Sequence, residues 1–282
     1  MSGVVLHADV RGANRPSDGT RLSSLVLPDP LGPALITLLG QDVILTPPQL
    51  DAIAKGVLHD ERHYVVAAPT NSGKTLIALL RVFTRSLDRG GRFVYVAPLK
   101  ALAEQKLHEF KSIAAAVAAH GGRRIKVSIS TGDYRISEDL PDCPPDEDAE
   151  ILICTPERLD VVLRNPQNHP WAASVDTYVL DEFHILGQAT RGARYEALVT
   201  RLLTVCPQSS LLALSATFGS RDSVSQWLAS ANHPLTFIDS DFRAPRLHRT
   251  LLQVEDKDQW ILDHLRGGIA SPARSFLIFV YR

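Results

Sequence analysis

The sequence predicts an α/β fold, a parallel β-sheet with helices on both faces. Short apolar, β-branched segments alternate with segments whose apolar residues recur at helical spacing. Polar loops follow several of the apolar segments, as they do at the carboxyl ends of parallel strands. The 282 residues, 45% hydrophobic and 22% charged, suffice for one large domain or two smaller ones.

Six strands and three helices are predicted in alternation along the chain. The strands cover residues 64–67, 92–96, 125–129, 151–154, 177–180 and 211–214. The helices follow from apolar residues spaced three or four positions apart, which form one stripe on a helix. These stripes comprise Leu76, Leu79, Leu80 and Phe83; Ala103, Leu107 and Phe110; and Tyr195, Leu198, Val199 and Leu202. A stretch rich in Pro and acids, residues 139–150, is expected to be an exposed loop.

The two ends of the chain differ from its middle. Residues 1–25 mix Gly, Arg, Asp and Ser without periodicity, so we expect a loose N-terminal tail. Residues 26–238 hold the alternating segments and form the main predicted domain. Residues 239–282 are expected to begin a second, incomplete domain, because a lone buried strand cannot cover both its faces. Its connector, short helix and strand are predicted over residues 241–249, 258–265 and 276–281.

Composition narrows the class of protein. The net charge of -1 gives no overall basic field, although the 30 Lys and Arg residues can still gather locally. The three cysteines form neither a C-x-x-C pair nor a metal-binding pattern, which favours a reducing compartment. No segment has the pattern of a signal peptide or the length of a membrane span. We therefore expect a cytoplasmic protein, or a nuclear one in a eukaryote, with no membrane partner.

Residues 68–75, Ala-Pro-Thr-Asn-Ser-Gly-Lys-Thr, have the pattern of a phosphate-binding loop between a strand and a helix. Backbone N–H groups and the positive end of the helix face the phosphates in such a loop. Lys74 can reach the β- and γ-phosphates, and the Thr75 hydroxyl can bind Mg²⁺. Because Ala68 replaces the usual first glycine, the loop alone could be a simple helix start. The predicted nucleotide-binding residues are Thr70, Asn71, Ser72, Gly73, Lys74 and Thr75.

A second polar segment strengthens this interpretation. Asp181 and Glu182 directly follow the predicted strand 177–180. A carboxylate at a strand end can hold Mg²⁺, so Asp181 joins Thr75 as a predicted metal ligand, and Glu182 can orient or deprotonate water. The acids could instead cap the strand, and the nearby His184 could be structural. Together with Lys74, however, they indicate a nucleoside triphosphatase in which all four side chains are catalytic candidates.

The order of these motifs resembles the first RecA-like domain of superfamily 2 DExH helicases, over residues 45–282. The most similar group holds repair helicases and the RNA helicases of the spliceosome and exosome. The resemblance implies a RecA-like P-loop NTPase domain that uses ATP and Mg²⁺. Residues 277–282 look like the opening of motif IV, which is the first strand of a second RecA-like domain.

The resemblance also implies roles for residues outside the phosphate loop. Gln49, in a Thr-Pro-Pro-Gln segment, would bond the adenine base, although it could instead cap a helix. Ser215 and Thr217 of motif III would couple the nucleotide to the bound strand, although both could be ordinary strand-end hydroxyls. Arg191 and Gly192 match a pair that follows the acids in the family, but they could simply start a helix. His184 would sense the phosphate or the opposing domain.

Three loops after predicted strands match those that touch the nucleic-acid backbone in the family. In a parallel sheet these loops emerge at the carboxyl edge, where ligands bind. Hydroxyls, free N–H groups and cations suit sequence-independent phosphate contact, although the cations could also be solvated surface charges. The residues assigned to single-stranded DNA or RNA are Pro98, Lys100, Gly132, Thr155, Pro156 and Arg158.

The predicted function is the ATP-binding motor half of an ATP-dependent helicase or translocase. A second RecA-like domain or subunit is the expected partner, because in the family it supplies arginine fingers. One such finger is worth roughly 10³–10⁵ in rate, so the isolated chain is expected to hydrolyse ATP slowly. The alternative is a non-catalytic or truncated module that binds ATP and nucleic acid. DNA versus RNA, polarity and pathway stay open.

Overall fold

The computed structural model describes most of the chain and divides it into two compact units. The larger unit spans Arg15–Ala244, and the smaller one combines Met1–Asn14 with Pro245–Arg282. The described residues are 3–11, 19–131, 148–188, 191–216, 221–229, 234–243, 246–254, 259–260 and 262–263.

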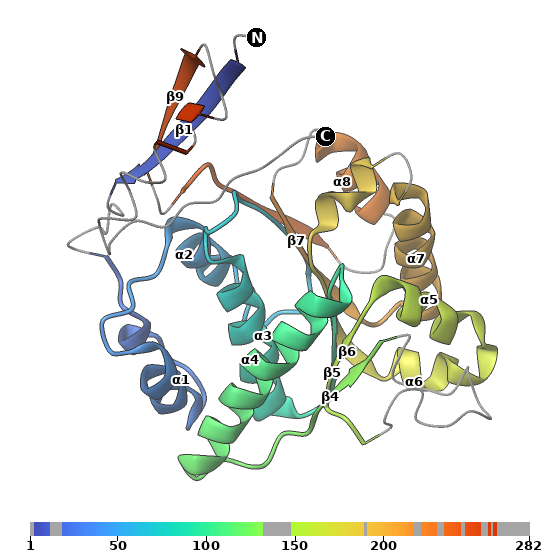
Figure 1. Cartoon of the computed structure of the whole chain (residues 1–282). Coiled ribbons are helices and arrows are strands. Elements are labelled where there is room, and N and C mark those ends of the chain that lie inside the picture. Colours follow the sequence, from blue (N-terminus) through green and yellow to red (C-terminus); the bar gives the residue numbers. More distant parts are fainter. Residues whose placement is uncertain are drawn as a thin grey trace. The chain divides into compact units, whose positions relative to one another are not determined.

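The larger unit is built on a seven-stranded sheet in the order β4-β5-β3-β6-β7-β2-β8 (Figure 1). Every neighbouring pair in this sheet runs parallel. The strands are β2 His63–Ala67, β3 Arg92–Val96, β4 Val127–Ser130, β5 Ile151–Cys154, β6 Val175–Leu180, β7 Ser210–Ser215 and β8 Leu235–Asp239. The six predicted strands are confirmed, with ends that differ by two residues or fewer. The sequence pattern does not predict β8, a short edge strand.

Helices cover both faces of this sheet, which confirms the predicted α/β class (Figure 1). One face carries α1 Leu31–Leu39, α2 Pro47–Ala54, α3 Lys74–Arg89 and α4 Lys100–Ala119. The other carries α5 Pro156–Arg164, α6 His169–Ala173, α7 Gly192–Val205 and α8 Arg221–Ala229. The 3₁₀ turns are η1 Leu22–Ser24, η2 Pro166–Asn168 and η3 Phe183–Gly187.

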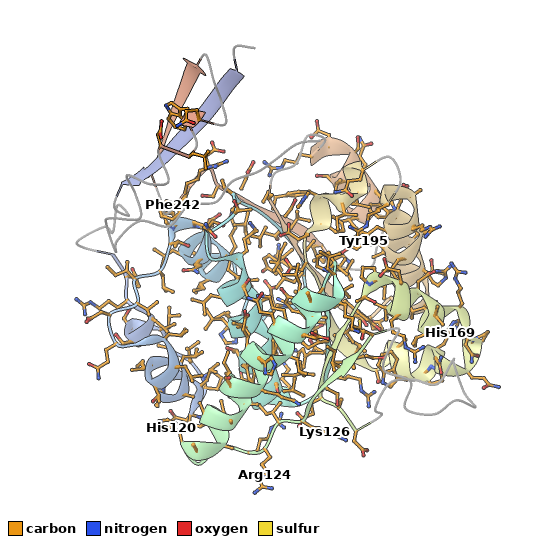
Figure 2. All side chains as sticks on the ribbon, viewed as in Figure 1. His120, Arg124, Lys126, His169, Tyr195 and Phe242 are labelled. Carbon is orange, nitrogen blue, oxygen red and sulfur yellow. The ribbon has the colours of Figure 1, made fainter. Side chains whose placement is uncertain are left out.

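Successive residues of a strand pack alternately into two hydrophobic cores, one on each face of the sheet. In β3, Phe93 and Tyr95 join the core under α1–α4, whereas Val94 and Val96 join the core under α5–α8. The three predicted helical stripes lie on α3, α4 and α7 and face these cores. Tyr195, labelled in Figure 2, lies in the layer between α7 and the sheet. Because helices cover both faces of the sheet, a ligand would bind at the loops that follow the ends of the strands.

The smaller unit contains an antiparallel pair, β1 Gly3–Arg11 with β9 Arg246–Val254. The prediction of a loose tail is therefore wrong for residues 3–11, and the predicted connector 241–249 is wrong from Arg246 onward. Local patterns could not reveal this pair, because the partners lie at opposite ends of the sequence. The predicted strand 276–281, half of the helix 258–265 and most of the loop 139–150 lie outside the described residues.

The described cysteines are buried free thiols. Burial raises the pKa of Cys154 to about 12. Burial likewise raises the pKa of Cys206 to about 11, against a smaller opposing effect of the Tyr178 hydrogen bond. Cys143 lies outside the described residues. Within the part of the chain that is described, no helix has the length and apolar character to cross a membrane.

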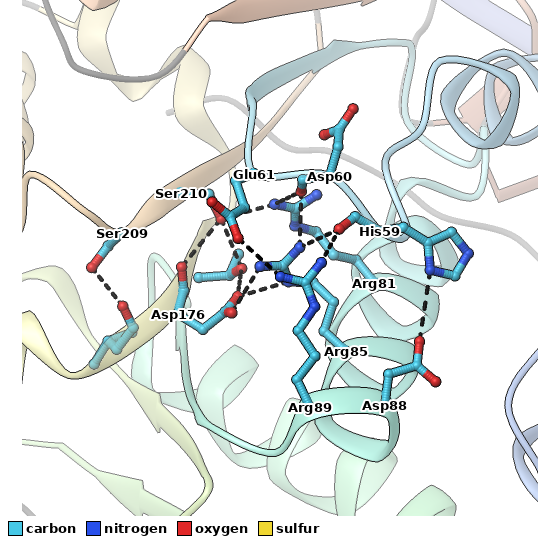
Figure 3. A network of polar contacts seen from close by, with 12 residues as sticks. His59, Asp60, Glu61, Arg81, Arg85, Asp88, Arg89, Asp176, Ser209 and Ser210 are labelled. Carbon is cyan, nitrogen blue, oxygen red and sulfur yellow. Dashed lines mark hydrogen bonds and ion pairs between the residues drawn. The ribbon is translucent and has the colours of Figure 1, made fainter.

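Two buried arginines of α3 fix this helix to the amino ends of β6 and β7 (Figure 3). Arg85 donates two hydrogen bonds of 2.7 Å, one to each carboxylate oxygen of Asp176 at the start of β6. Arg81 donates to the Val57 carbonyl and, at 2.8 Å, to the Ser210 hydroxyl at the start of β7. Two-point arginine–carboxylate contacts are strong and geometrically specific. The contacts therefore set the position of α3 along the strands.

The pKa of Asp176 reflects this network. Burial raises the pKa of its carboxyl, but hydrogen bonds from Arg85 and Thr177, together with the positive charges of Arg85 and Arg81, outweigh burial, and the net pKa lies below the ordinary value of 3.8. A carboxyl with a depressed pKa in the folded state stabilises the protein above its ordinary pKa. That contribution is lost as the pH falls and the carboxylate takes up a proton.

We predict that Asp176→Asn destabilises the protein by on the order of 3 kcal/mol at neutral pH, because it leaves the buried charge of Arg85 unpaired. The difference from the wild type should shrink as the pH falls below about 3.8, where the carboxyl of the unfolded chain takes up a proton, and should be smallest below the depressed pKa of folded Asp176. Urea unfolding at a series of pH values measures both effects. Asp148→Asn is the control, because Asp148 is 89% exposed and lies 3.7 Å from Lys126. If both variants lost the same free energy of unfolding, the proposed role of the network would be contradicted.

Candidate functional site

The parallel sheet brings the predicted site loops to one edge. The loops after β6, β7 and β2 are neighbours, and the loops after β4, β5 and β3 lie beside them on the β6 side. Backbone bonds join adjacent loops: the N–H of Ala68 donates to Ser215 at 3.1 Å, and that of Asp181 donates to Val96 at 3.0 Å. The described residues of the predicted nucleotide site and of the predicted strand-binding site thus occupy two adjacent halves of one edge.

The phosphate loop has the backbone of a tight turn into a helix. Gly73 (φ 86°) and Asn71 (φ 64°) both adopt left-handed conformations, and α3 begins immediately afterwards at Lys74. Thr70 and Asn71 are exposed, whereas Ser72 is fully buried. The helix start places its positive end at the loop, as anion binding requires.

Gln49 and Thr46 brace this loop from α2. The Thr46 hydroxyl donates to the Ser72 carbonyl at 2.7 Å, and the Gln49 amide donates to the Gly73 carbonyl at 2.8 Å. The amide oxygen of Gln49 also accepts from the N–H of Thr46 at 2.8 Å, which completes a capping box on α2. Gln49 is therefore a helix cap and a loop brace. Its contact with adenine stays a prediction.

Gly73 has no room for a side chain. A Cβ atom there would lie 2.1 Å from the Nε2 atom of Gln49. Because Gln49 is only 4% exposed and its amide makes two hydrogen bonds, it cannot move aside without breaking the brace. The glycine is thus required by both its backbone angle and the close approach of Gln49.

Lys74 and the two acids share one electrostatic environment. The ammonium group of Lys74 lies within the curve of its own loop and donates to the carbonyls of Ala68 and Pro69 at 2.6 and 2.9 Å. Burial lowers the pKa of Lys74, and the negative charges of Glu182 and Asp181 oppose that shift. A lysine after β2 and two acids after β6 are therefore close enough to act on one ligand.

Asp181 is held by a tyrosine that sequence patterns did not single out. The Tyr95 hydroxyl donates to the Oδ2 atom of Asp181 at 2.6 Å, and the N–H of Glu182 donates to Oδ1 at 3.0 Å. Burial raises the pKa of Tyr95 well above its usual value, so the hydroxyl stays a donor. The sequence signal that could have identified Tyr95 is a hydroxyl-bearing side chain within the apolar part of β3, the strand that pairs with β6.

Glu182 and His184 form the second part of this loop. The Nδ1 atom of His184 lies 3.1 Å from the Oε2 atom of Glu182, and both side chains are about one third exposed. Glu182 has a φ of 51°, a left-handed conformation that costs energy outside glycine and is concentrated at functional sites. The Glu182 carboxylate thus lies beside His184 and is accessible to water.

The residues present fit a magnesium ion. The Thr75 hydroxyl and the Asp181 carboxylate are hard oxygen donors, the type that Mg²⁺ prefers. Among the described residues, no group of three or more His, Cys, Asp or Glu side chains could hold a metal by itself. A magnesium ion here would therefore take its other ligands from phosphate and water, as is usual for nucleotide sites.

The predicted strand-binding residues lie on the other half of the edge. Pro98 is buried, and Lys100 begins α4 with an exposed side chain. Thr155 caps α5 by accepting from the N–H of Arg158, and Pro156 is the buried first residue of that helix. The Arg158 guanidinium donates to the Ser130 hydroxyl at 3.1 Å, which ties the first turn of α5 to the end of β4. Contact of these residues with nucleic acid stays a prediction.

Four further predicted positions have different outcomes. Arg191 does more than start α7, because its guanidinium donates to the Pro98 carbonyl at 2.9 Å. Ser215 is fully buried at the end of β7, between the acids and the phosphate loop, which suits the predicted coupling role without testing it. Thr217 and Gly132 lie outside the described residues.

Comparison with known proteins agrees with this geometry. Residues 46–224 match the family described as DEAD/DEAH box helicase. The chain is 36% identical, over 73% of its length, to an ATP-dependent DNA helicase Hel308 of Pyrococcus horikoshii, of which it covers 26%. It is 34% identical, again over 73% of its length, to Hel308 of Thermococcus kodakarensis, of which it covers 16%. The chain thus spans about a quarter or less of these relatives.

Solved structures show the same fold. The Mycobacterium smegmatis helicase Lhr, bound to ssDNA and AMP-PNP, aligns with a TM-score of 0.57 at 30% identity, covering 74% of this chain and 27% of Lhr. The DEAD-box helicase Mss116, bound to ssRNA and UDP-BeF, aligns with a TM-score of 0.63 at 23% identity, covering 80% of this chain and 46% of Mss116. The narrower subgroup predicted from sequence stays a prediction.

We predict that Gly73→Ala destabilises the protein more than Gly121→Ala does. The two glycines have nearly the same positive φ, 86° and 88°, which costs an alanine roughly 1–2 kcal/mol, but a Cβ at Gly121 meets nothing within 4 Å. Only Gly73→Ala also displaces Gln49 from its brace. Urea unfolding of both single variants measures the difference.

A double variant checks the cause. Gln49→Ala removes the clashing amide, so Gly73→Ala should cost less in that background than in the wild type. Strict additivity of the two substitutions would show that the brace does not limit Gly73.

Proposed function

Because the chain belongs to the DEAD/DEAH box helicase family, we propose that it is the ATP-binding motor half of an ATP-dependent nucleic-acid helicase or translocase. The observation that carries this proposal is the convergence of Lys74, Asp181 and Glu182 from two loops that flank β7. Phosphoryl transfer needs positioning and charge neutralisation, and this arrangement can supply both.

Each side chain has a defined part in the proposed reaction. Lys74 binds the β- and γ-phosphates while the N–H groups of its loop surround them. Thr75 and Asp181 hold Mg²⁺, which neutralises phosphate charge when it is bound. Glu182 orients or deprotonates the attacking water, and the adjacent His184 orients Glu182 or responds to the phosphate.

The proposed partners follow from the other half of the sheet edge. The loops after β3, β5 and β4 bind the sugar-phosphate backbone of a single strand, with Lys100 as an exposed cation. We infer single-stranded DNA, because the matched relatives are named DNA helicases and the Lhr structure holds ssDNA. A second RecA-like domain would supply arginine fingers and complete the strand-binding track. A cytoplasmic location also stays a proposal.

We predict that Lys74→Met and Glu182→Gln have different effects on the two steps. Lys74→Met should weaken ATP binding, because it removes the cation at the phosphates. Glu182→Gln should retain ATP binding within about twofold and lower single-turnover hydrolysis by roughly 10²-fold or more, because water loses its base. Titration with a fluorescent ATP analogue and rapid-quench hydrolysis measure the two steps.

Glu196→Gln, on the exposed face of α7, is the matched control and should leave both quantities unchanged. The alternative of a non-catalytic binding module predicts ATP binding without any hydrolysis that depends on Glu182. Equal hydrolysis by the wild type and Glu182→Gln would therefore favour that alternative.

We predict that Lys100→Ala weakens binding of a fluorescent single-stranded oligonucleotide. The slope of log affinity against log salt concentration should also become shallower by about one, the amount that one lost phosphate contact causes. Lys126→Ala, an equal loss of charge near the amino end of β4, is the control and should change little. Fluorescence anisotropy with DNA and RNA of the same sequence measures affinity and preference. Tighter binding of the RNA would contradict the inference of a DNA substrate.

A further inference from the structure

Lys106 is a buried cation beside the phosphate loop that the proposed reaction has not used. It lies in the second turn of α4 and is 7% exposed. Its ammonium group donates to Glu109 at 2.8 Å and to the hydroxyl of Thr75 at 3.4 Å. Thr75 is the residue proposed to hold Mg²⁺, so Lys106 contacts a residue of the candidate metal site.

A surface ion pair does not explain this placement. Lysine is among the residues least often buried, because its charge loses hydration. The neighbour Glu109, three residues along the same helix, is 31% exposed in its side chain and could pair with a lysine that pointed to solvent. Lys106 instead turns inward, and the contact it gains there is with Thr75.

The contact suits a hydroxyl that binds a metal. A threonine hydroxyl has two lone pairs, so accepting a hydrogen bond from Lys106 leaves one lone pair for Mg²⁺. The same bond restrains rotation about χ1 and thereby fixes the direction of the remaining lone pair. Partners of this kind, one step removed from the metal, usually orient the atoms that bind it.

The helix α4 supports the second proposed metal ligand as well. Phe110 of α4 packs edge-on against Tyr95, with ring centroids 5.5 Å apart. The Tyr95 hydroxyl in turn donates to Asp181 at 2.6 Å. Residues of α4 therefore contact Thr75 directly and Asp181 through Tyr95. The first residue of α4 is Lys100, which belongs to the predicted strand-binding half of the sheet edge.

We propose that Lys106 is a positioning residue of the nucleotide site, which fixes the Thr75 hydroxyl for Mg²⁺ and ties that hydroxyl to the helix that begins at the strand-binding loop. This inference rests on the proposed function. It concerns a contact between α3 and α4 and assigns Lys106 no direct contact with the nucleotide.

The test is the magnesium dependence of nucleotide binding. The affinity of a fluorescent ATP analogue is measured with Mg²⁺ and with EDTA, for the wild type, Lys106→Met and Lys111→Met. Lys106→Met should weaken binding roughly tenfold with Mg²⁺ and less than about twofold with EDTA, since only metal-dependent binding uses the oriented hydroxyl. Lys111→Met removes an exposed charge from the same helix and should change neither value.

A double-mutant cycle separates positioning from general support of the fold. In a Thr75→Val background the effect of Lys106→Met should fall below about twofold, because the hydroxyl it positions is gone. The variant Lys106→Met/Glu109→Gln removes both charges and should show the same loss, which keeps the test available if an unpaired Glu109 disturbs α4. Thermal unfolding accompanies each variant.

The outcomes distinguish this inference from the proposed function. A wild type that binds the analogue with no dependence on Mg²⁺, or not at all, overturns the proposed function and this inference with it. Magnesium-dependent binding that Lys106→Met leaves unchanged overturns this inference alone. An equal loss in the wild-type and Thr75→Val backgrounds also overturns it, because Lys106 would then act independently of the hydroxyl.

Discussion

The parallel pairing of β6, β7 and β2 is the constraint on which the candidate site depends. Parallel strands all end at the same edge, so a loop after β2 and a loop after β6 are held one strand apart. Lysine and acids that are about a hundred residues apart in the chain thereby act on each other electrostatically. The same pairing places β3 beside β6, so the strand-binding half of the edge begins where the nucleotide half ends.

The helix α3 is anchored at both ends, and this explains how the phosphate loop keeps its position. At its start, Thr46 and Gln49 bond the carbonyls of the two residues before Lys74. Further along, buried arginines bond the first residues of β6 and β7. The sheet that carries the acids therefore also holds the helix that carries Lys74. Buried polar contacts therefore hold Lys74 and the acids in fixed relative positions, as precise binding of a triphosphate requires.

The sequence predicted those parts of the structure that depend on local pattern. Apolar periodicity located six strands and three helices, and the spacing of polar residues at strand ends located Lys74 and Asp181. It missed β8, the β1–β9 pair, and the roles of Tyr95 and Lys106. Each of these depends on a partner distant in the sequence, which no local pattern records. Gln49 shows the intermediate case, because its use as a cap was visible in the sequence and its bond to Gly73 was not.

The burial of Cys154 and Cys206 has a practical consequence for spectroscopy. With pKa values of about 12 and about 11, these thiols are almost wholly protonated at neutral pH, and only the thiolate reacts quickly with maleimides. A cysteine introduced on an exposed loop, in a background without Cys143, would accept a fluorophore or spin label selectively. The rate of labelling of the two native sulfhydryls would then measure how often the core under α5–α8 opens transiently.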